Sequence, residues 1–306
     1  MSFGRMGSYA ASAAICAALG CVAMAQEPPS VKAFHPAGPL PSYEVATIKP
    51  ANPVLSPTGR AIRIASTLRG YIAMAYGVQM PPNAAPGCAG CQVIGGPAWV
   101  DQDRYDIDGK PPDALRDAMQ KMSKKERQQQ TQMLAQSLLA ERFRLKVHFE
   151  TRELPVLELV PAKGGLKITA VDPPPPHDPA QPMKLPKPGE PEPPGMTGFS
   201  IRPDGSVVIQ AGATTMEAFA GGLRAFSPEM AERPVIDMTG FKGNFDVKEF
   251  RFLGPQRSGA AATAEAPTDA EPVDVALERQ LGIKLVRAKG PVEVVVIDSI
   301  DRPTEN

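Results

Sequence analysis

Four blocks of sequence recur in the same order in the two halves of this 306-residue chain. Each half has a threonine before an amphipathic helical pattern, then an aromatic–Asp–apolar strand, then a helix that runs into a strand, and last an apolar strand that begins with proline. We interpret this order as an internal duplication, because one periodic pattern recurs by chance but four ordered blocks do not. The matched segments are 67–71 with 215–219, 105–107 with 245–247, 143–145 with 283–285, and 155–160 with 291–296.

The predicted fold class is α+β, with two similar modules, each a mostly antiparallel sheet with helices packed on one face, joined by a proline-rich linker. The modules cover residues 42–170 and 198–306, and the linker covers 171–197, where dense proline cannot build a packed core. Residues 26–41 are proline-rich and aperiodic, which predicts a disordered lead-in. Residues 254–272 are rich in Ala, Pro and Gly and predict a mobile loop in the second module.

The first 25 residues have the composition of a secretory signal peptide. Arg5 supplies the positive start, an Ala-rich apolar run follows, and Ala23–Ala25 (Ala-Met-Ala) forms a cleavage site before Gln26. The apolar run is shorter than the ~20 residues that a spanning helix needs, and no later stretch is apolar enough to cross a bilayer. We therefore expect an exported protein, periplasmic or extracellular, with no transmembrane segment in the mature chain. Lipidation at Cys21 is the alternative, although Ala18 stands where a bacterial lipobox has a larger aliphatic residue.

Local patterns predict the helices and strands of each half. Thr67 caps a helix whose apolar residues recur at helical spacing, and Thr215 caps its counterpart in the second half. The alternating residues before Pro155 and the apolar run after it predict two separate strands. In the same way, residues 283–287 and 292–297 predict the two strands of a terminal hairpin.

Charge and motifs exclude several classes of function. The 33 basic and 33 acidic side chains balance, and the basic residues are scattered without stacking aromatics, so we expect no nucleic-acid partner. The sequence has no G-x-S-x-G and no H-E-x-x-H motif. His148 lies between Lys146 and Glu150 on the polar side of a predicted strand, which favours a solvated histidine over a catalytic base.

The densest acidic cluster consists of Asp101, Asp103, Asp106 and Asp108. Arg104 stands where the first ligand of a calcium loop belongs, so we interpret these carboxylates as solvent-exposed side chains of strands and turns. We predict no metal site, no cofactor and no catalytic residue. A carboxylate pair at glycosidase spacing stays open, because sequence does not give distances in space.

Two cysteines, Cys88 and Cys91, remain after signal-peptide cleavage. An oxidising compartment favours their pairing, and we predict a local disulfide that stiffens the loop. The alternative is a redox dithiol, which needs a helix N-terminus to lower one thiol pKa, and the surrounding Gly- and Pro-rich loop predicts no helix there. We expect the disulfide to add little stability, because the ring that it closes is very small.

Several segments together resemble one known family. They are Y-E-V-A-T-I-K-P (43–50), T-L-R-G-Y-I-A-M-A-Y-G (67–77), I-G-G-P-A-W-V-D-Q-D-R-Y-D-I (94–107), L-L-A-E-R-F-R-L-K-V-H-F-E-T-R-E-L-P-V-L-E-L-V (138–160), R-P-V-I-D-M-T-G-F-K-G-N-F-D (233–246), Q-L-G-I-K-L (280–285) and P-V-E-V-V-V-I-D-S-I-D-R-P-T-E-N (291–306). These segments are similar to soil-associated secreted proteins, expanded in acidobacteria, that carry one domain of unknown function. The family has no established catalytic residues, so the resemblance implies none for this chain. Related domains are sometimes joined to membrane sensor peptidases of the BlaR type, which implies a sensing or binding role.

From these observations we expect a noncatalytic exported module that binds or senses an unknown small molecule, a peptide or a cell-envelope component. One alternative is an assembly partner in the envelope, by analogy with the small modules of secretins and outer-membrane receptors. Another is a secreted hydrolase with a nonstandard site. That hypothesis requires several carboxylates, or His148 and a serine, to converge in a cleft between the halves.

Overall fold

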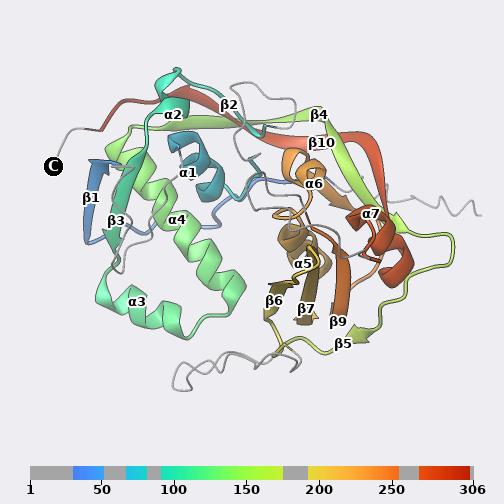
Figure 1. Ribbon diagram of the computed structural model, residues 1–306. Helices are drawn as coiled ribbons and strands as arrows, with labels where there is room; N and C mark the ends of the chain where they lie inside the picture. The colour runs from blue at the N-terminus through green and yellow to red at the C-terminus, as the bar shows by residue number, and fades with distance from the viewer. Residues whose placement is uncertain (1–29, 52–66, 81–90, 175–191, 255–268, 304–306) are drawn as a thin grey trace, which may run out of the picture.

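The computed structural model describes residues 30–51, 67–80, 91–174, 192–254 and 269–303, which form a mixed α and β fold (Figure 1). The predicted α+β class is confirmed at this level. The strands are β1 Val45–Pro50, β2 Val93–Gly95, β3 Tyr105–Lys110, β4 Lys146–Pro161, β5 Ala170–Val171, β6 Thr197–Ile201, β7 Ser206–Thr214, β8 Val235–Asp237, β9 Asn244–Leu253 and β10 Ile283–Ser299. The helices are α1 Leu68–Ala75, α2 Trp99–Gln102, α3 Asp113–Gln120, α4 Lys124–Arg142, α5 Met216–Leu223, α6 Pro228–Glu232 and α7 Val273–Ala276, the last followed by a π-helical turn, Leu277–Leu281.

Two long strands, β4 and β10, cross the molecule and form the middle of its central sheet. They pair antiparallel from Lys146 opposite Ser299 to Pro161 opposite Ile283. β2 pairs in parallel with the last part of β10, and β8 pairs in parallel with the last part of β4, so the strand order is β2-β10-β4-β8. We call the β4–β10 pair the central ribbon. It runs along the top of the molecule in Figure 1, above α1 and α4 on one side and α5 and α6 on the other.

Both long strands are continuous, so the predictions of a separate strand from Pro155 and of a terminal hairpin are wrong. A strand tolerates proline where its missing N–H would face away from the paired neighbour. The Leu157 amide donates a hydrogen bond on the β8 side, so the nitrogen of Pro155, two residues earlier, also points away from β10. The Glu293 amide donates to Val31 outside the ribbon, and Pro291 therefore has the same relation to β4.

Two buried clusters lie beneath the two ends of the ribbon. The first core packs between α1, α4, β1 and β3, and the second between α5, α6, β7 and β9. The first core includes Leu68, Ile72, Leu139 and Phe143 together with Val295 and Ile297 of β10. The second core includes Phe219, Phe245, Phe250 and Ile283 together with Leu157 and Leu159 of β4. Each core therefore takes a strand end from the other half of the chain, while the predicted boundaries at 42–170 and 198–306 stay predictions.

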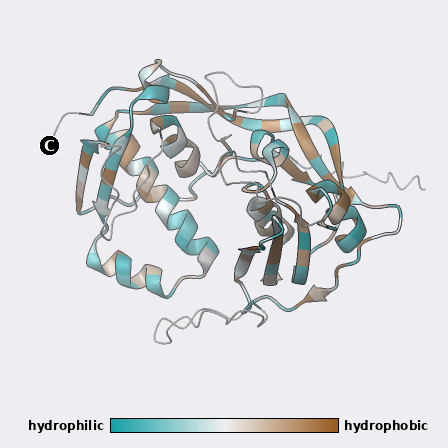
Figure 2. Cartoon of the chain, in the orientation of Figure 1, coloured by the Kyte–Doolittle hydropathy of each residue, from teal (hydrophilic) through white to brown (hydrophobic). Residues whose placement is uncertain are grey.

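The smaller sheets complete the two ends. β1 and β3 form an antiparallel pair beside the first core, and an antiparallel sheet of order β5-β9-β7-β6 lies beside the second. Figure 2 shows hydrophilic and hydrophobic residues alternating along β4, β9 and β10, as expected for strands with one buried face. No helix among the described residues has both the length and the apolar character needed to cross a bilayer.

The two predicted helix caps are confirmed. The Thr67 hydroxyl accepts a hydrogen bond from the Gly70 amide at 3.3 Å, and the Thr215 hydroxyl accepts one from the Ala218 amide at 3.2 Å. At the other end of α1, the buried amide of Gln136 donates to the Ala75 carbonyl at 3.0 Å. That bond pairs a carbonyl that would otherwise lack a partner and fixes α1 against α4.

Part of the predicted disordered lead-in lies against the central sheet, so that prediction is wrong for residues 31–35. Val31 forms a parallel bridge with β10, and the Ala33 amide donates to the Glu293 carboxylate at 2.7 Å. The His35 ring nitrogen Nε2 lies 2.8 Å from the same carboxylate, and its ring lies 4.1 Å from that of Phe149, centroid to centroid. These contacts order the segment despite its proline content.

Other predictions fall on parts of the chain outside the described residues. These are the signal peptide with Cys21, residues 26–29, most of the linker (175–191) and most of the predicted loop (255–268). Cys88 also lies outside them. Cys91 is buried just before β2, and the Cys88–Cys91 disulfide stays a prediction.

Candidate functional site

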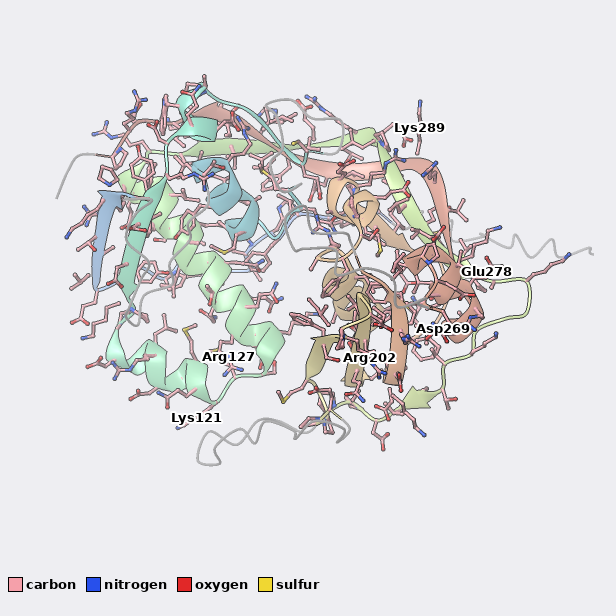
Figure 3. The ribbon with its side chains drawn as sticks, in the orientation of Figure 1. Lys121, Arg127, Arg202, Asp269, Glu278 and Lys289 are labelled. Carbon is pink, nitrogen blue, oxygen red and sulfur yellow. The ribbon has the colours of Figure 1, made fainter. Side chains whose placement is uncertain are left out.

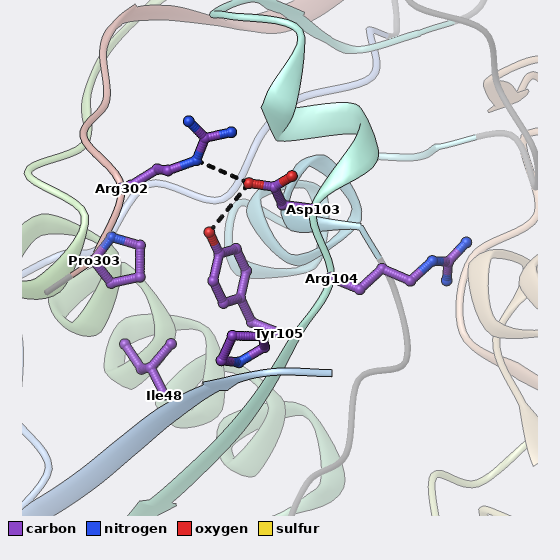
Figure 4. A pocket seen from close by; sticks show the side chains of 7 residues that line it. Ile48, Asp103, Arg104, Tyr105, Arg302 and Pro303 are labelled. Atoms are coloured by element: carbon purple, nitrogen blue, oxygen red, sulfur yellow. Dashed lines mark hydrogen bonds and ion pairs between the residues drawn. The ribbon is translucent and has the colours of Figure 1, made fainter. Parts of the chain in front are cut away.

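A cavity of about 400 Å³ lies at the outer end of the first core (Figure 4). It forms where β1, the start of β3 and the C-terminal segment meet. We name it the Asp103–Arg302 pocket, and its lining residues are Ile48, Pro50, Asp103, Arg104, Tyr105, Arg302 and Pro303. They come from three distant parts of the sequence.

Strand pairing positions one side of the pocket. β1 runs antiparallel to β3, with Pro50 opposite Tyr105 and Ile48 opposite Ile107. The Tyr105 ring packs edge-on against Phe143 of the first core, with the ring centroids 5.5 Å apart. This contact fixes the tyrosine ring and leaves its hydroxyl at the pocket.

A buried ion pair holds the short helix α2 that leads into β3. The side chains of Arg69 on α1 and Asp101 on α2 are only 6% and 12% exposed. The Arg69 guanidinium donates from Nη2 to Asp101 at 2.9 Å, and it also donates to the carbonyls of Val93 at 3.1 Å and Gly95 at 2.9 Å. One side chain therefore ties α1, β2 and α2 together and sets the position of Asp103, the residue after α2.

Asp103 accepts the hydrogen bonds that join the polar side chains of the pocket. Arg302 donates from Nε to Asp103 Oδ2 at 3.0 Å, and the Tyr105 hydroxyl donates to the same oxygen at 3.4 Å, as the dashed lines in Figure 4 show. The Arg302 guanidinium carbon also lies 5.0 Å from the centroid of the Trp99 ring, a cation–π contact. Burial and the Asp103 charge raise the pKa of Tyr105, and Arg302 offsets only part of this rise, so the hydroxyl keeps its proton.

The chemistry of this arrangement suits binding. The arginine supplies donors, Asp103 supplies an acceptor, and Ile48, Pro50 and Pro303 supply aliphatic surface. Among the described residues that line the pocket, none is a serine, cysteine, histidine or lysine that could act as a nucleophile or a base near neutral pH.

His148 lies apart from this lining, in an exposed row of charged side chains on β4 and β10. Its Nδ1 lies 2.7 Å from Asp298 Oδ1, and its Nε2 lies 3.1 Å from Glu150 Oε1. Arg152 donates to the other Glu150 oxygen. The hydrogen bonds to Glu150 and Asp298 raise the pKa of His148, and those from His148 and Arg152 lower the pKa of Glu150. Both ring nitrogens therefore bond to carboxylates, which is the geometry of a surface ion cluster.

The structure separates the four clustered carboxylates. Asp101 pairs with Arg69 and Asp103 belongs to the pocket, whereas Asp106 is half-buried and Asp108 is exposed on β3. Within the described part of the chain, no three acidic, histidine or cysteine side chains gather as a metal site would require. The basic residues Lys121 and Arg127 lie on different elements, Lys121 at the end of α3 and Arg127 on α4 (Figure 3).

Sequence reasoning did not identify Arg302 as a site residue. Arg302 and Asp103 are 199 positions apart, and no spacing rule connects residues at that separation. The contact of Trp99 with the Arg302 guanidinium is likewise a product of the tertiary structure.

Comparison with known proteins gives one family match. The profile of a family described as protein of unknown function (DUF3738) matches residues 69–300, which includes most of both cores and of the central ribbon. No curated protein and no solved structure was found to match the chain.

Proposed function

The chain belongs to this family of unknown function (DUF3738), and from that premise we propose that it is an exported, noncatalytic module that binds a small molecule in the Asp103–Arg302 pocket. The observation that carries the proposal is the pocket itself. Its volume of about 400 Å³ lies toward the low end of the range of roughly 300–1,000 Å³ that holds small ligands. Its lining combines aliphatic surface with a few fixed polar groups, the usual composition of a binding site.

The two described histidines support a noncatalytic role. His148 bonds to two carboxylates, and His35 bonds to Glu293. A general base needs a ring nitrogen within hydrogen-bond reach of the proton that it removes. Because carboxylates occupy both ring nitrogens of His148 and the Nε2 of His35, we assign neither histidine to bond-breaking chemistry.

The proposal is tested by a thermal-shift screen of the mature chain against soluble fragments of the cell envelope. The chain has one tryptophan, Trp99, so its fluorescence reports directly on the arginine that stacks on it. We expect at least one fragment to raise the melting temperature and change the Trp99 emission in the wild type. The Arg302→Gln variant should lose both effects.

Arg202→Gln is the matched control, since Arg202 is also an exposed arginine paired with a carboxylate but lies beside the second core (Figure 3). It should respond to ligand as the wild type does. A screen with no responding fragment contradicts the proposal, as does a fragment whose effect survives in Arg302→Gln.

Export is part of the proposal and rests on the composition of residues 1–25. Mass spectrometry of the protein from the periplasm or the medium should find a mature chain that begins at Gln26. A chain that retains Met1 in the cytoplasm would contradict it, and a lipid on Cys21 would favour the anchored alternative.

We also propose that the two ends of the molecule are duplicated modules joined by the proline-rich linker. The order α1-β2-β3-α4-β4 resembles the order α5-β8-β9-α7-β10, and each first helix begins at a threonine cap. Each short strand also pairs in parallel with the end of the long strand from the other half. These likenesses support a duplication in which the two final strands are exchanged.

The resemblance to soil-associated secreted proteins, and through them to domains joined to sensor peptidases of the BlaR type, supports a sensing role for the bound state. We propose that ligand binding is the signal, because the proposed site supplies recognition but no reaction.

A further inference from the structure

We infer that the Asp103–Arg302 pocket takes a small carboxylate with an aliphatic body. This inference rests on the proposed function, since it names the class of ligand for that same pocket. Three observations lead to it, namely the charge of the lining, the fixed position of Arg302 and the aliphatic surface beside it.

The first observation is the sign of the charge. Two arginines, Arg104 and Arg302, and one carboxylate, Asp103, line the pocket. Asp103 already accepts hydrogen bonds from Arg302 and Tyr105. The Arg104 side chain points away from this ion pair (Figure 4), so Arg302 is the cation that a ligand beside Asp103 meets. The Arg302 side chain is more exposed than that of Asp103, which leaves more donor than acceptor surface and favours an anion.

The second observation is that Arg302 is held in place but keeps donors available. Asp103 accepts a hydrogen bond from its Nε, and the Trp99 ring centroid lies 5.0 Å from its guanidinium carbon. The side chain is 61% exposed, so the guanidinium stays open to solvent. A guanidinium held at Nε can present its two terminal nitrogens to the two oxygens of a carboxylate. Because the side chain is already ordered, binding costs less conformational entropy.

The third observation is the apolar surface beside this polar end. Ile48 is buried, and Pro50, which pairs opposite Tyr105, and Pro303 add two rigid rings to the lining. These groups offer contact to a branched or cyclic aliphatic chain but no further hydrogen-bond donors. A ligand of a few carbon atoms with one carboxylate matches both ends of the pocket.

The test compares three compounds of nearly the same shape on the mature full-length chain. They are 4-methylpentanoate, its amide 4-methylpentanamide, and the cation 3-methylbutylammonium. Binding is followed by Trp99 fluorescence and by ligand-observed NMR. We expect the carboxylate to bind at least about tenfold more tightly than the amide, and the cation to bind most weakly.

Variants assign that preference to the arginine. Arg302→Gln should remove the preference for carboxylate over amide, and Arg302→Lys should keep only part of it, because lysine has the charge without the planar fork. Arg202→Gln should leave the preference unchanged. Circular dichroism of each variant establishes that it is folded.

The outcomes separate this inference from the proposed function. If the amide binds as tightly as the carboxylate and Arg302→Gln weakens both, the pocket binds ligands but the inferred class is wrong. Preference for the cation also overturns the inference and makes Asp103 the recognising group. If none of the three compounds binds and no envelope fragment responds, both the inference and the proposed function fail.

Discussion

Replacing Arg69 with methionine tests how the candidate site is held together. Methionine has a similar length and can follow the same path through the core, but it has no charge and no hydrogen-bond donor. The change removes the hydrogen bonds to Asp101 and to the carbonyls of Val93 and Gly95. It also leaves the Asp101 carboxylate, which is only 12% exposed, without its partner.

The expected loss follows from that burial. Breaking a buried ion pair by removing one partner costs about 3–5 kcal/mol, chiefly because the other charge stays desolvated. A whole domain is stable by only about 5–15 kcal/mol, so this loss is a large share of the total. The double variant Arg69→Met with Asp101→Leu removes both charges, and we expect it to be more stable than Arg69→Met alone.

Urea unfolding followed by far-UV circular dichroism measures these differences. The native Trp99 emission should also change in Arg69→Met, because α2 carries Trp99 and loses its tie to α1. A loss below about 1 kcal/mol would refute the reasoning, since it would place the pair among exposed salt bridges. A double variant less stable than the single variant would show that desolvation of the unpaired Asp101 carboxylate is not the main cost.

Three further perturbations test other parts of the fold. Fragments 30–174 and 192–306 should each be largely unfolded alone, because each lacks the strand end that completes its core. Mixing the two fragments should restore the native circular dichroism spectrum. A fragment that folds alone contradicts the exchange of strands. His148→Gln should lower the melting temperature at pH values below 6.5, the ordinary pKa, where the raised pKa of His148 adds its full stabilisation. That difference should vanish as the pH rises through the folded-state pKa, and a difference independent of pH would count against the ion cluster. Gly282→Ala places a Cβ against the backbone carbonyl oxygen of Gly165 at φ +66° and should cost more than about 1 kcal/mol in urea unfolding. Gly164→Ala has open space around the added Cβ and should cost less than about 0.5 kcal/mol, and equal costs would contradict the role of the left-handed conformation.

The local elements of the fold could be predicted because their causes are local. A threonine cap and apolar residues at helical spacing are enough to define the helices after Thr67 and Thr215. The same local reasoning divided β4 at Pro155 and β10 near Pro291, where proline usually ends or begins a strand. It was wrong there because the cost of proline depends on which side of the strand has a partner, and that is a property of the sheet.

The candidate site shows the same division. His148 could be predicted as a solvated strand histidine from its charged neighbours, although its two carboxylate partners include Asp298, 150 positions away. The Asp103–Arg302 pocket could not be predicted, since its residues come from β1, β3 and the C-terminal segment. A buried or paired charge gains its role from neighbours in space, and sequence separation carries almost no information about them.

Helix caps, hydrophobic periodicity and turn residues act over a few positions, so the α+β class and the capped helices can be predicted from the sequence. It takes the folded chain to pair β4 with β10 along their whole length, to complete each core with a strand of the other half, and to bring Arg302 to Asp103 and Trp99. The physical reason is that these contacts join residues more than a hundred positions apart, and their energies depend on burial and geometry that exist only after the chain has folded.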